Sequence, residues 1–131
     1  MIKLRPMTMD DAVFMLKLKN YHETRKFAIK SKGKILFDDH VKWLKSNLKY
    51  FQIIEYGKKI AGAIRVENKE VSVWLDRAMR RKGLATQAVD SVSKHGYSAK
   101  IVTGNVPSMR VFITCGYSPV SFTNGYYTFK K

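Results

Sequence analysis

The stretch that decides the fold is Val71-Ser72-Val73-Trp74-Leu75-Asp76-Arg77-Ala78-Met79-Arg80-Arg81-Lys82-Gly83-Leu84-Ala85. Apolar residues alternate over 71–75 and predict a strand, whereas apolar residues at helical spacing predict a helix over 83–95. The turn between them is basic and contains Gly83, so a phosphate can approach the exposed N–H groups of the helix start without meeting a Cβ. The sequence therefore predicts an anion-binding turn between a strand and a helix.

Periodicity on both sides of this turn predicts a mixed order of strands and helices. Strands are expected at residues 2–6, 50–55, 60–66, 71–75, 100–103, 118–122 and 126–129, and helices after Thr8 or Asp10, after Asp38 and Asp39, over 83–95 and over 107–114. The first helix is expected to bury Val13, Leu16 and Leu18, and Pro107 is expected at the first position of the last helix. Since no repeat or linker interrupts this order, residues 1–131 are predicted to form one α/β (α+β) domain, a sheet covered by helices.

The segment from Tyr21 to Lys34 has no clean period, and it contains Ser31, Gly33 and several basic residues. These features are typical of an irregular segment on the surface. We expect a substrate-binding loop here.

Composition limits the partners that the chain can have. Its 131 residues suit a single domain, and its net charge of +15, from 25 Lys and Arg against 10 Asp and Glu, attracts anions. Nucleic acid, a nucleotide cofactor with several phosphates and a nucleotide-sugar substrate are all compatible with that charge. No apolar run has the length of a membrane helix and the N-terminus lacks the apolar region of a secretory signal, so we expect a cytoplasmic protein without a membrane partner. The single cysteine, Cys115, and the spacing of the histidines predict neither a disulfide nor a metal site.

Two motifs give the strongest functional signal. Arg80, Gly83 and Ala85 match the pattern Q/R-x-x-G-x-G/A, and the turn that they form resembles the pyrophosphate-binding loop of the GCN5-related N-acetyltransferases, the GNAT superfamily. The downstream segment resembles the family pattern N-x-x-S-x-x-x-Y-x-x-x-G-F at Asn105, Ser108, Phe112, Gly116 and Tyr117. This resemblance implies a mixed, mostly antiparallel central sheet that is splayed between its fourth and fifth strands, with helices on both faces.

The same resemblance implies acetyl-CoA as the cosubstrate, with its pantetheine arm in the gap of the splayed sheet. The residues expected to bind it are Val73, Trp74 and Leu75 in the strand, Arg80, Arg81, Lys82, Gly83, Leu84, Ala85 and Thr86 in the turn, and Asn105, Ser108 and Arg110 further on. The strand backbone would bind the arm as an added strand does, and a backbone N–H near Leu75 would stabilise the negative charge that develops on the thioester oxygen.

Catalysis needs a proton acceptor for the amine and a proton donor for the CoA thiolate. Many family members have a tyrosine donor where this chain has Phe112, which cannot donate a proton. Tyr117, Tyr97, Tyr50, water or solvent are the alternatives, and Tyr117 is also expected to pack in the core. Glu70 is the first candidate for the acceptor, with Glu67 and His40 as alternatives. The candidate catalytic residues are therefore Glu70, Tyr117 and His40.

The N-terminal half indicates the acceptor only faintly. Leu18-Lys19-Asn20 and residues 38–44 resemble segments of the N-acetyltransferases that modify UDP-linked 4-amino sugars in pseudaminic acid synthesis, which implies substrate binding by Asn20 and His40. A primary amine on a nucleotide-linked amino sugar, an anionic substrate, is the acceptor that this favours. A ribosomal-protein N-terminal acetyltransferase and a non-catalytic module that binds nucleic acid are the alternatives. The sequence leaves the oligomeric state and the preferred acyl chain open.

Overall fold

The computed structural model describes residues 1–29 and 33–131, so part of the predicted substrate loop, residues 30–32, lies outside the described residues. The described residues form one sheet of seven strands in the order β1-β2-β3-β4-β5-β7-β6. β4 and β5 are parallel, and the other neighbouring pairs are antiparallel. The predicted α/β architecture with a mixed, mostly antiparallel sheet is confirmed.

Apart from α2, which was not predicted, the strands and helices follow the predicted order along the chain. The strands are β1 (Ile2–Pro6), β2 (Phe51–Tyr56), β3 (Lys59–Glu67), β4 (Glu70–Leu75), β5 (Ser98–Val102), β6 (Ser118–Thr123) and β7 (Tyr126–Lys130). The helices are α1 (Ala12–Asn20), α2 (His22–Lys26), α3 (Phe37–Asn47), α4 (Leu84–Val92) and α5 (Val106–Thr114), with short 3-10 turns at Met9–Asp11, Leu48–Tyr50 and Arg77–Met79. Among the described residues, none of the helices combines the length and the apolar character needed to cross a membrane.

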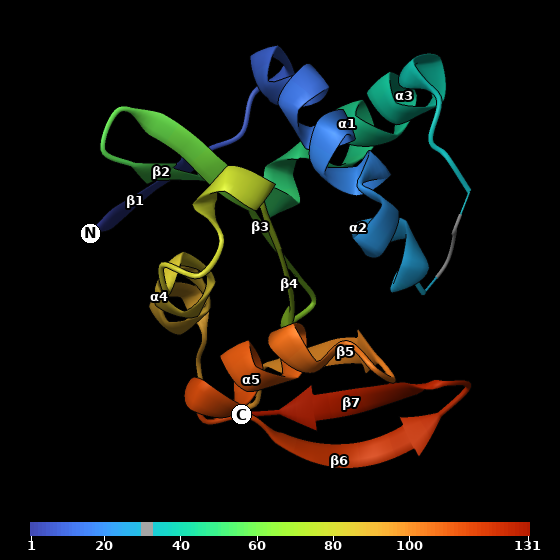
Figure 1. Ribbon diagram of the computed structural model, residues 1–131, viewed down its shortest axis with the longest axis vertical. Coiled ribbons are helices and arrows are strands. Elements are labelled where there is room, and N and C mark those ends of the chain that lie inside the picture. Colours follow the sequence, from blue (N-terminus) through green and yellow to red (C-terminus); the bar gives the residue numbers. More distant parts are fainter. Residues whose placement is uncertain (30–32) are drawn as a thin grey trace.

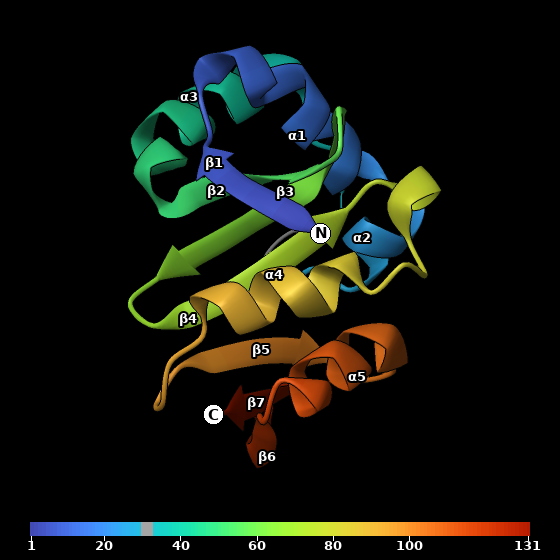
Figure 2. The same ribbon diagram turned by 90° about the vertical axis from the view of Figure 1, so that its left-hand side faces the viewer.

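Helices cover both faces of the sheet, as predicted. Figure 1 shows α4 on one side of β3 and β4 and α1–α3 on the other, and Figure 2 shows α4 and α5 against the same face. Adjacent residues of β2 show how one strand supplies both layers: Ile54 packs in the apolar cluster with Leu84 of α4, and Ile53 packs in the cluster with Leu18 of α1. The alternation that predicts strands therefore also divides the core into two layers.

The buried stripe of α1 differs from the predicted one. Val13 is 68% exposed, because the face of α1 that meets the sheet repeats every three residues at Ala12, Met15 and Leu18. The prediction of Val13 as a core residue is wrong, whereas that of Leu18 is confirmed.

Two other helix boundaries also differ. α4 ends at Val92, so the predicted extension to residue 95 is wrong, because Ser93 is extended (φ −81°, ψ 135°) and Gly96 turns the chain with a φ of 89°. α5 begins at Val106, which places Pro107 at the second helical position instead of the first. Proline fits both positions, since neither N–H has a partner within the helix.

Candidate functional site

β4 and β5 are parallel neighbours that separate along their length. In the described residues their register contains a single pair, Glu70 opposite Ser98, at the start of both strands. Residues 73–75 of β4 are paired with β3 on one side and with no strand on the side of β5. The predicted splay between the fourth and fifth strands is confirmed. The edge of β4 that faces the gap has backbone groups outside strand pairing, and an extended ligand can bind them.

The loop after β4 leads to the N-terminus of α4 at the open end of this fork. Arg81 and Gly83 have positive φ angles, 66° and 75°, which coil the loop tightly. The N–H of Gln87 donates to the carbonyl oxygen of Gly83 at 3.1 Å, and this first bond of α4 leaves the N–H groups of residues 84–86 without a partner inside the helix. A Cβ at Gly83 would meet no described atom within 4 Å. The loop therefore has the open N–H groups and the positive charge that a phosphate needs.

Asn105 lies at the same end of the fork, because β4 and β5 are parallel and their carboxyl ends point the same way. Its Oδ1 accepts a hydrogen bond from the N–H of Ser108 at 3.4 Å and so caps α5. Lys82 in the loop and Arg110 in α5 are both exposed. The structure thus brings the predicted cofactor residues together at the open end of the fork, where α4 and α5 pack against each other.

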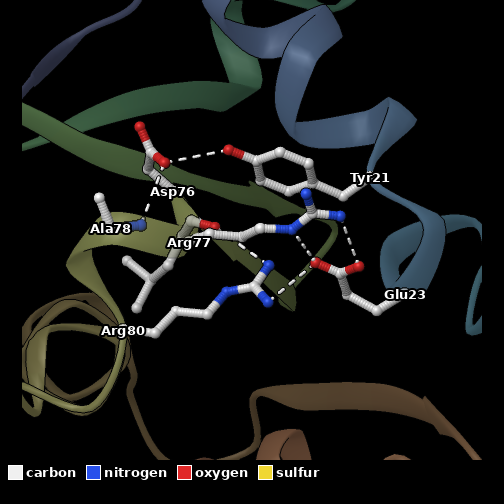
Figure 3. Close-up of polar contacts among 7 residues, drawn as sticks. Tyr21, Glu23, Asp76, Arg77, Ala78 and Arg80 are labelled. Carbon is white, nitrogen blue, oxygen red and sulfur yellow. Dashed lines mark hydrogen bonds and ion pairs between the residues drawn. The ribbon is translucent and has the colours of Figure 1, made fainter.

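Arg80, the first residue of the predicted signature, binds groups of the protein itself in this structure. Its Nη1 donates to Glu23 Oε1 at 3.0 Å (Figure 3). Its Nη2 donates to the carbonyl oxygen of Leu75 at 3.4 Å. Arg77 holds the same carboxylate with its Nε and Nη2, at 2.7 and 2.8 Å. These hydrogen bonds, above all those from Arg77, lower the pKa of Glu23 to about 2. Glu23 is therefore an anion held by both arginines at the end of β4.

Tyr21 attaches the same loop to α1 and α2. Its hydroxyl donates to Asp76 Oδ1 at 3.0 Å, and the guanidinium of Arg77 lies 4.1 Å from its ring centre (Figure 3). The prediction of an irregular segment is wrong for α2, whose five residues are too few to show a period. The contacts of Tyr21, Glu23 and Arg77 were therefore not predicted, because they depend on where α2 lies. The signal that the sequence offered was a single glutamate, Glu23, within a basic segment.

Lys19 of α1 lies on the opposite face of the sheet. Its Nζ is 3.3 Å from the centre of the Trp43 ring, and the half-buried amine lies near the guanidinium of Arg65. Burial, with a smaller contribution from Arg65, lowers the pKa of Lys19 to about 8. This lysine therefore loses its proton far more readily than an exposed one.

Asn20 and His40, the predicted substrate-binding residues, both bind the protein backbone. The side chain of Asn20 donates to the carbonyl oxygen of Ile35 at 3.0 Å and accepts from the N–H of Ile35 at 2.8 Å. His40 is 1% exposed, and its Nε2 donates to the carbonyl oxygen of Ala12 at 3.0 Å. Burial lowers the pKa of His40, so its ring stays neutral. These two residues hold α1, α3 and the segment before α3 together.

The three candidate catalytic residues differ in their access to solvent. Tyr117 is 2% exposed, its hydroxyl lies 2.6 Å from Ser93 Oγ, and burial raises its pKa. Its ring packs edge-on against Phe112 in the core, as expected for an aromatic at this position. His40 is equally inaccessible, whereas the side chain of Glu70 is 30% exposed. A group that exchanges protons with bound substrates needs access to the space that they enter, and of the three Glu70 alone has it.

Comparison with known families agrees with the geometry of this site. Residues 15–117 match the acetyltransferase (GNAT) family, a match that begins within α1 and includes the fork, the loop and α5. No curated protein sequence is significantly similar to the chain.

Solved structures share the fold at low sequence identity. A domain from Methanocaldococcus jannaschii DSM 2661 superposes with a TM-score of 0.81 at 16% identity, over 100% of this chain and 97% of that one. A spermidine N-acetyltransferase from Vibrio cholerae, in complex with CoA and spermine, has a TM-score of 0.79 at 15% identity, over 98% and 92%. A ribosomal L7/L12 α-N-protein acetyltransferase in complex with coenzyme A has a TM-score of 0.78 at 15% identity, over 99% and 93%. Each likeness extends over nearly the whole of both chains.

Proposed function

We propose, from the premise that this chain belongs to the acetyltransferase (GNAT) family, that it transfers the acetyl group of acetyl-CoA to a primary amine. The observation that carries the proposal is the fork between β4 and β5, whose open end adjoins the N-terminus of α4. Acetyl-CoA has a diphosphate, an extended arm and a thioester in that order, and the loop and the fork offer a binding surface for each in the same order.

The phosphates would bind the N–H groups of residues 84–86, with Gly83 allowing their close approach. Arg80, Arg81 and Lys82 surround this position with positive charge, and Lys82 or Arg110 would reach the 3′-phosphate. The arm would lie along residues 73–75 of β4, beside Asn105 and Ser108 at the start of α5. The two acetyltransferases compared above support this assignment, because both were solved with coenzyme A bound.

Glu70 would act as the proton acceptor. It takes one proton from the acceptor ammonium, and the neutral nitrogen then forms a bond to the acetyl carbon while the carbon–sulfur bond breaks. A backbone N–H on the open edge of β4 would stabilise the oxyanion of the transition state, and it must lie nearer to Glu70 than the expected Leu75, which is five residues, or about 17 Å, away along the strand. The nitrogen loses its second proton as the amide forms, and the CoA thiolate takes a proton from solvent, since Phe112 has none to give and the hydroxyl of Tyr117 is buried.

The sequence resemblance supports the class of amine less well than it supports the use of acetyl-CoA. The nucleotide-linked amino sugar depends on Asn20 and His40, and both side chains already bind the protein backbone. A protein N-terminus is the second candidate, because one structural neighbour is a ribosomal α-N-protein acetyltransferase. Nucleic-acid binding rests on the charge of +15 alone.

Two measurements test the proposal together. Isothermal titration should show acetyl-CoA binding in the micromolar range, and free-thiol release should rise with at least one member of a panel of amino acids, amino sugars, polyamines and peptides. A matched titration with bulk tRNA at physiological salt tests the alternative, a non-catalytic module that binds nucleic acid. Tight binding of tRNA with no heat from acetyl-CoA would contradict the proposal.

A further inference from the structure

A cavity of about 320 Å³ lies where the fork between β4 and β5 closes. Glu70 and Ser98, which form the strand pair at this end of the fork, both line it. A ligand arm that starts at the loop after β4 and follows β4 back toward its first residue would run roughly 17 Å, at about 3.3 Å per residue, and end beside this cavity. The cavity is therefore placed to receive the second substrate.

The cavity lies on the face of the sheet opposite α4 and α5. Ala99 and Ile101 of β5 are buried in the cluster under these helices, so Lys100 between them points to the other face. On β4, Val71 belongs to the same cluster, and Glu70 therefore shares the face of Lys100. Both line the cavity, and an acceptor bound in it would meet the thioester from the face opposite the cofactor loop.

Among the described residues that line the cavity, positive and negative charges are balanced, although the chain as a whole is strongly basic. Arg65 pairs with Glu67, and Lys100 Nζ lies 3.4 Å from Glu70 Oε1. The side chain of Arg65 keeps 22% of its surface exposed beside this pair. The volume of the cavity is at the lower end of the range for ligand sites, which suits a small ligand. The two cations and two carboxylates around it suit a ligand that carries both signs of charge.

We propose that this cavity is the acceptor site and that its ligand is a small zwitterion of the α-amino acid type. The ligand ammonium binds Glu70, which is the proton acceptor of the proposed function, and the ligand carboxylate binds Lys100 and the partly exposed guanidinium of Arg65. Each end of the ligand replaces one half of an internal ion pair, so no charge in the cavity is left unpaired. This inference rests on the proposed acetyl transfer.

The test compares acceptors that differ only in the carboxylate. Thiol release from acetyl-CoA is measured with the twenty amino acids and with the corresponding amino acid amides, and with spermidine and a tripeptide as the other amine classes. The kcat/KM of the best amino acid should exceed that of its own amide by about 100-fold, because the amide lacks the negative charge that forms two charge-assisted hydrogen bonds in the cavity.

Variants of the cavity assign the discrimination to its residues. Lys100→Met should lower kcat/KM for the amino acid about tenfold, mainly through KM, and leave the amide unchanged, whereas Lys100→Glu should make spermidine the better acceptor. Lys58→Met, at an exposed lysine in the β2–β3 turn, is the matched control and should change neither. Glu70→Gln should lower kcat for every amine while the affinity for acetyl-CoA, measured by titration, stays the same.

The outcomes separate this inference from the proposed function. If amino acids and their amides are acetylated equally, or if only polyamines or peptides are acetylated, the zwitterion assignment is overturned and acetyl transfer stands. If acetyl-CoA binds and none of the acceptors is used, the assignment is also overturned. If acetyl-CoA does not bind at all, the proposed function itself fails.

Discussion

The side of the fold that carries α4 and α5 and the side that carries α1–α3 differ in which groups they offer to a ligand. On the first side the groups are backbone N–H donors, at residues 84–86 and along the open edge of β4. On the second side they are charged side chains, such as Glu70 and Lys100, that come from separate strands. Backbone recognition requires a fixed local conformation and therefore leaves a short motif, whereas side-chain recognition requires only proximity in space.

The strongest test of this contrast is Gly83→Val. A side chain at this position would occupy the space that the diphosphate needs, so acetyl-CoA affinity should fall about 100-fold, or roughly 2.7 kcal/mol, by calorimetry. Gly57→Val is the matched control, since Gly57 also has positive φ, 61°, and open space around it, in the β2–β3 turn. Both variants should lose similar stability, about 1 kcal/mol. Equal acetyl-CoA affinities in the two variants would contradict the backbone site.

The next effect concerns the amine of Lys19 on the α1–α3 side. Its pKa is lowered in the folded chain from 10.5 to about 8, so the unfolded state binds more protons between these values and stability should rise with pH in that window. Relative to Lys19→Met, the wild type should gain about 1–2 kcal/mol between pH 8 and 10 in urea melts. Parallel pH profiles of the two proteins would show that Lys19 titrates normally.

A smaller effect is expected from Tyr117→Phe. The variant loses the hydrogen bond to Ser93, so unfolding free energy should fall by about 1 kcal/mol, and Ser93→Ala should lower it by a similar, non-additive amount. kcat should not change, because the hydroxyl is buried away from substrates. A tenfold fall in kcat, with loss of the alkaline limb of the pH profile, would instead identify Tyr117 as the proton donor.

The smallest effect is expected from Glu23→Gln, because Glu23 of α2 contacts arginines of the loop that leads to α4. Glu23 occupies Arg77 and Arg80 with a carboxylate that competes with phosphate, so the neutral variant should bind acetyl-CoA about threefold more tightly. The gain should shrink in high salt, which screens exposed charges. Weaker binding by the variant would mean that Glu23 positions the arginines for the cofactor rather than competing for them.

The parts that sequence predicted well are those with local causes. The loop and the order of strands along the chain follow from alternation and from Gly83, whereas the fork was expected from the resemblance of two short motifs, at Arg80 and Asn105, to a known family. The buried stripe of α1 was misassigned because a small rotation of a nine-residue helix about its axis is enough to bury Ala12 in place of Val13. The turn after α4 was missed because Ser93 and Lys94 fit a helix equally well by pattern.

The acceptor side could not be assembled from the sequence. Arg65 and Glu70 lie on either side of the β3–β4 turn, but Lys100 comes from β5, about 30 residues further along the chain, and no periodic signal connects it to them. Likewise, the pairing of Glu23 with Arg77 depends on where α2 packs, which its five residues do not encode locally.

The most direct test of the central claim is an amide-resolved NMR titration of the chain with coenzyme A. The largest shifts should fall on the N–H groups of residues 83–86, followed by residues 73–75 of β4 and Asn105, with little change in the β2–β3 turn. A second cavity is lined by Lys45, Lys49 and Phe51. Shifts concentrated there, with the amides of residues 83–86 unchanged, would contradict the account.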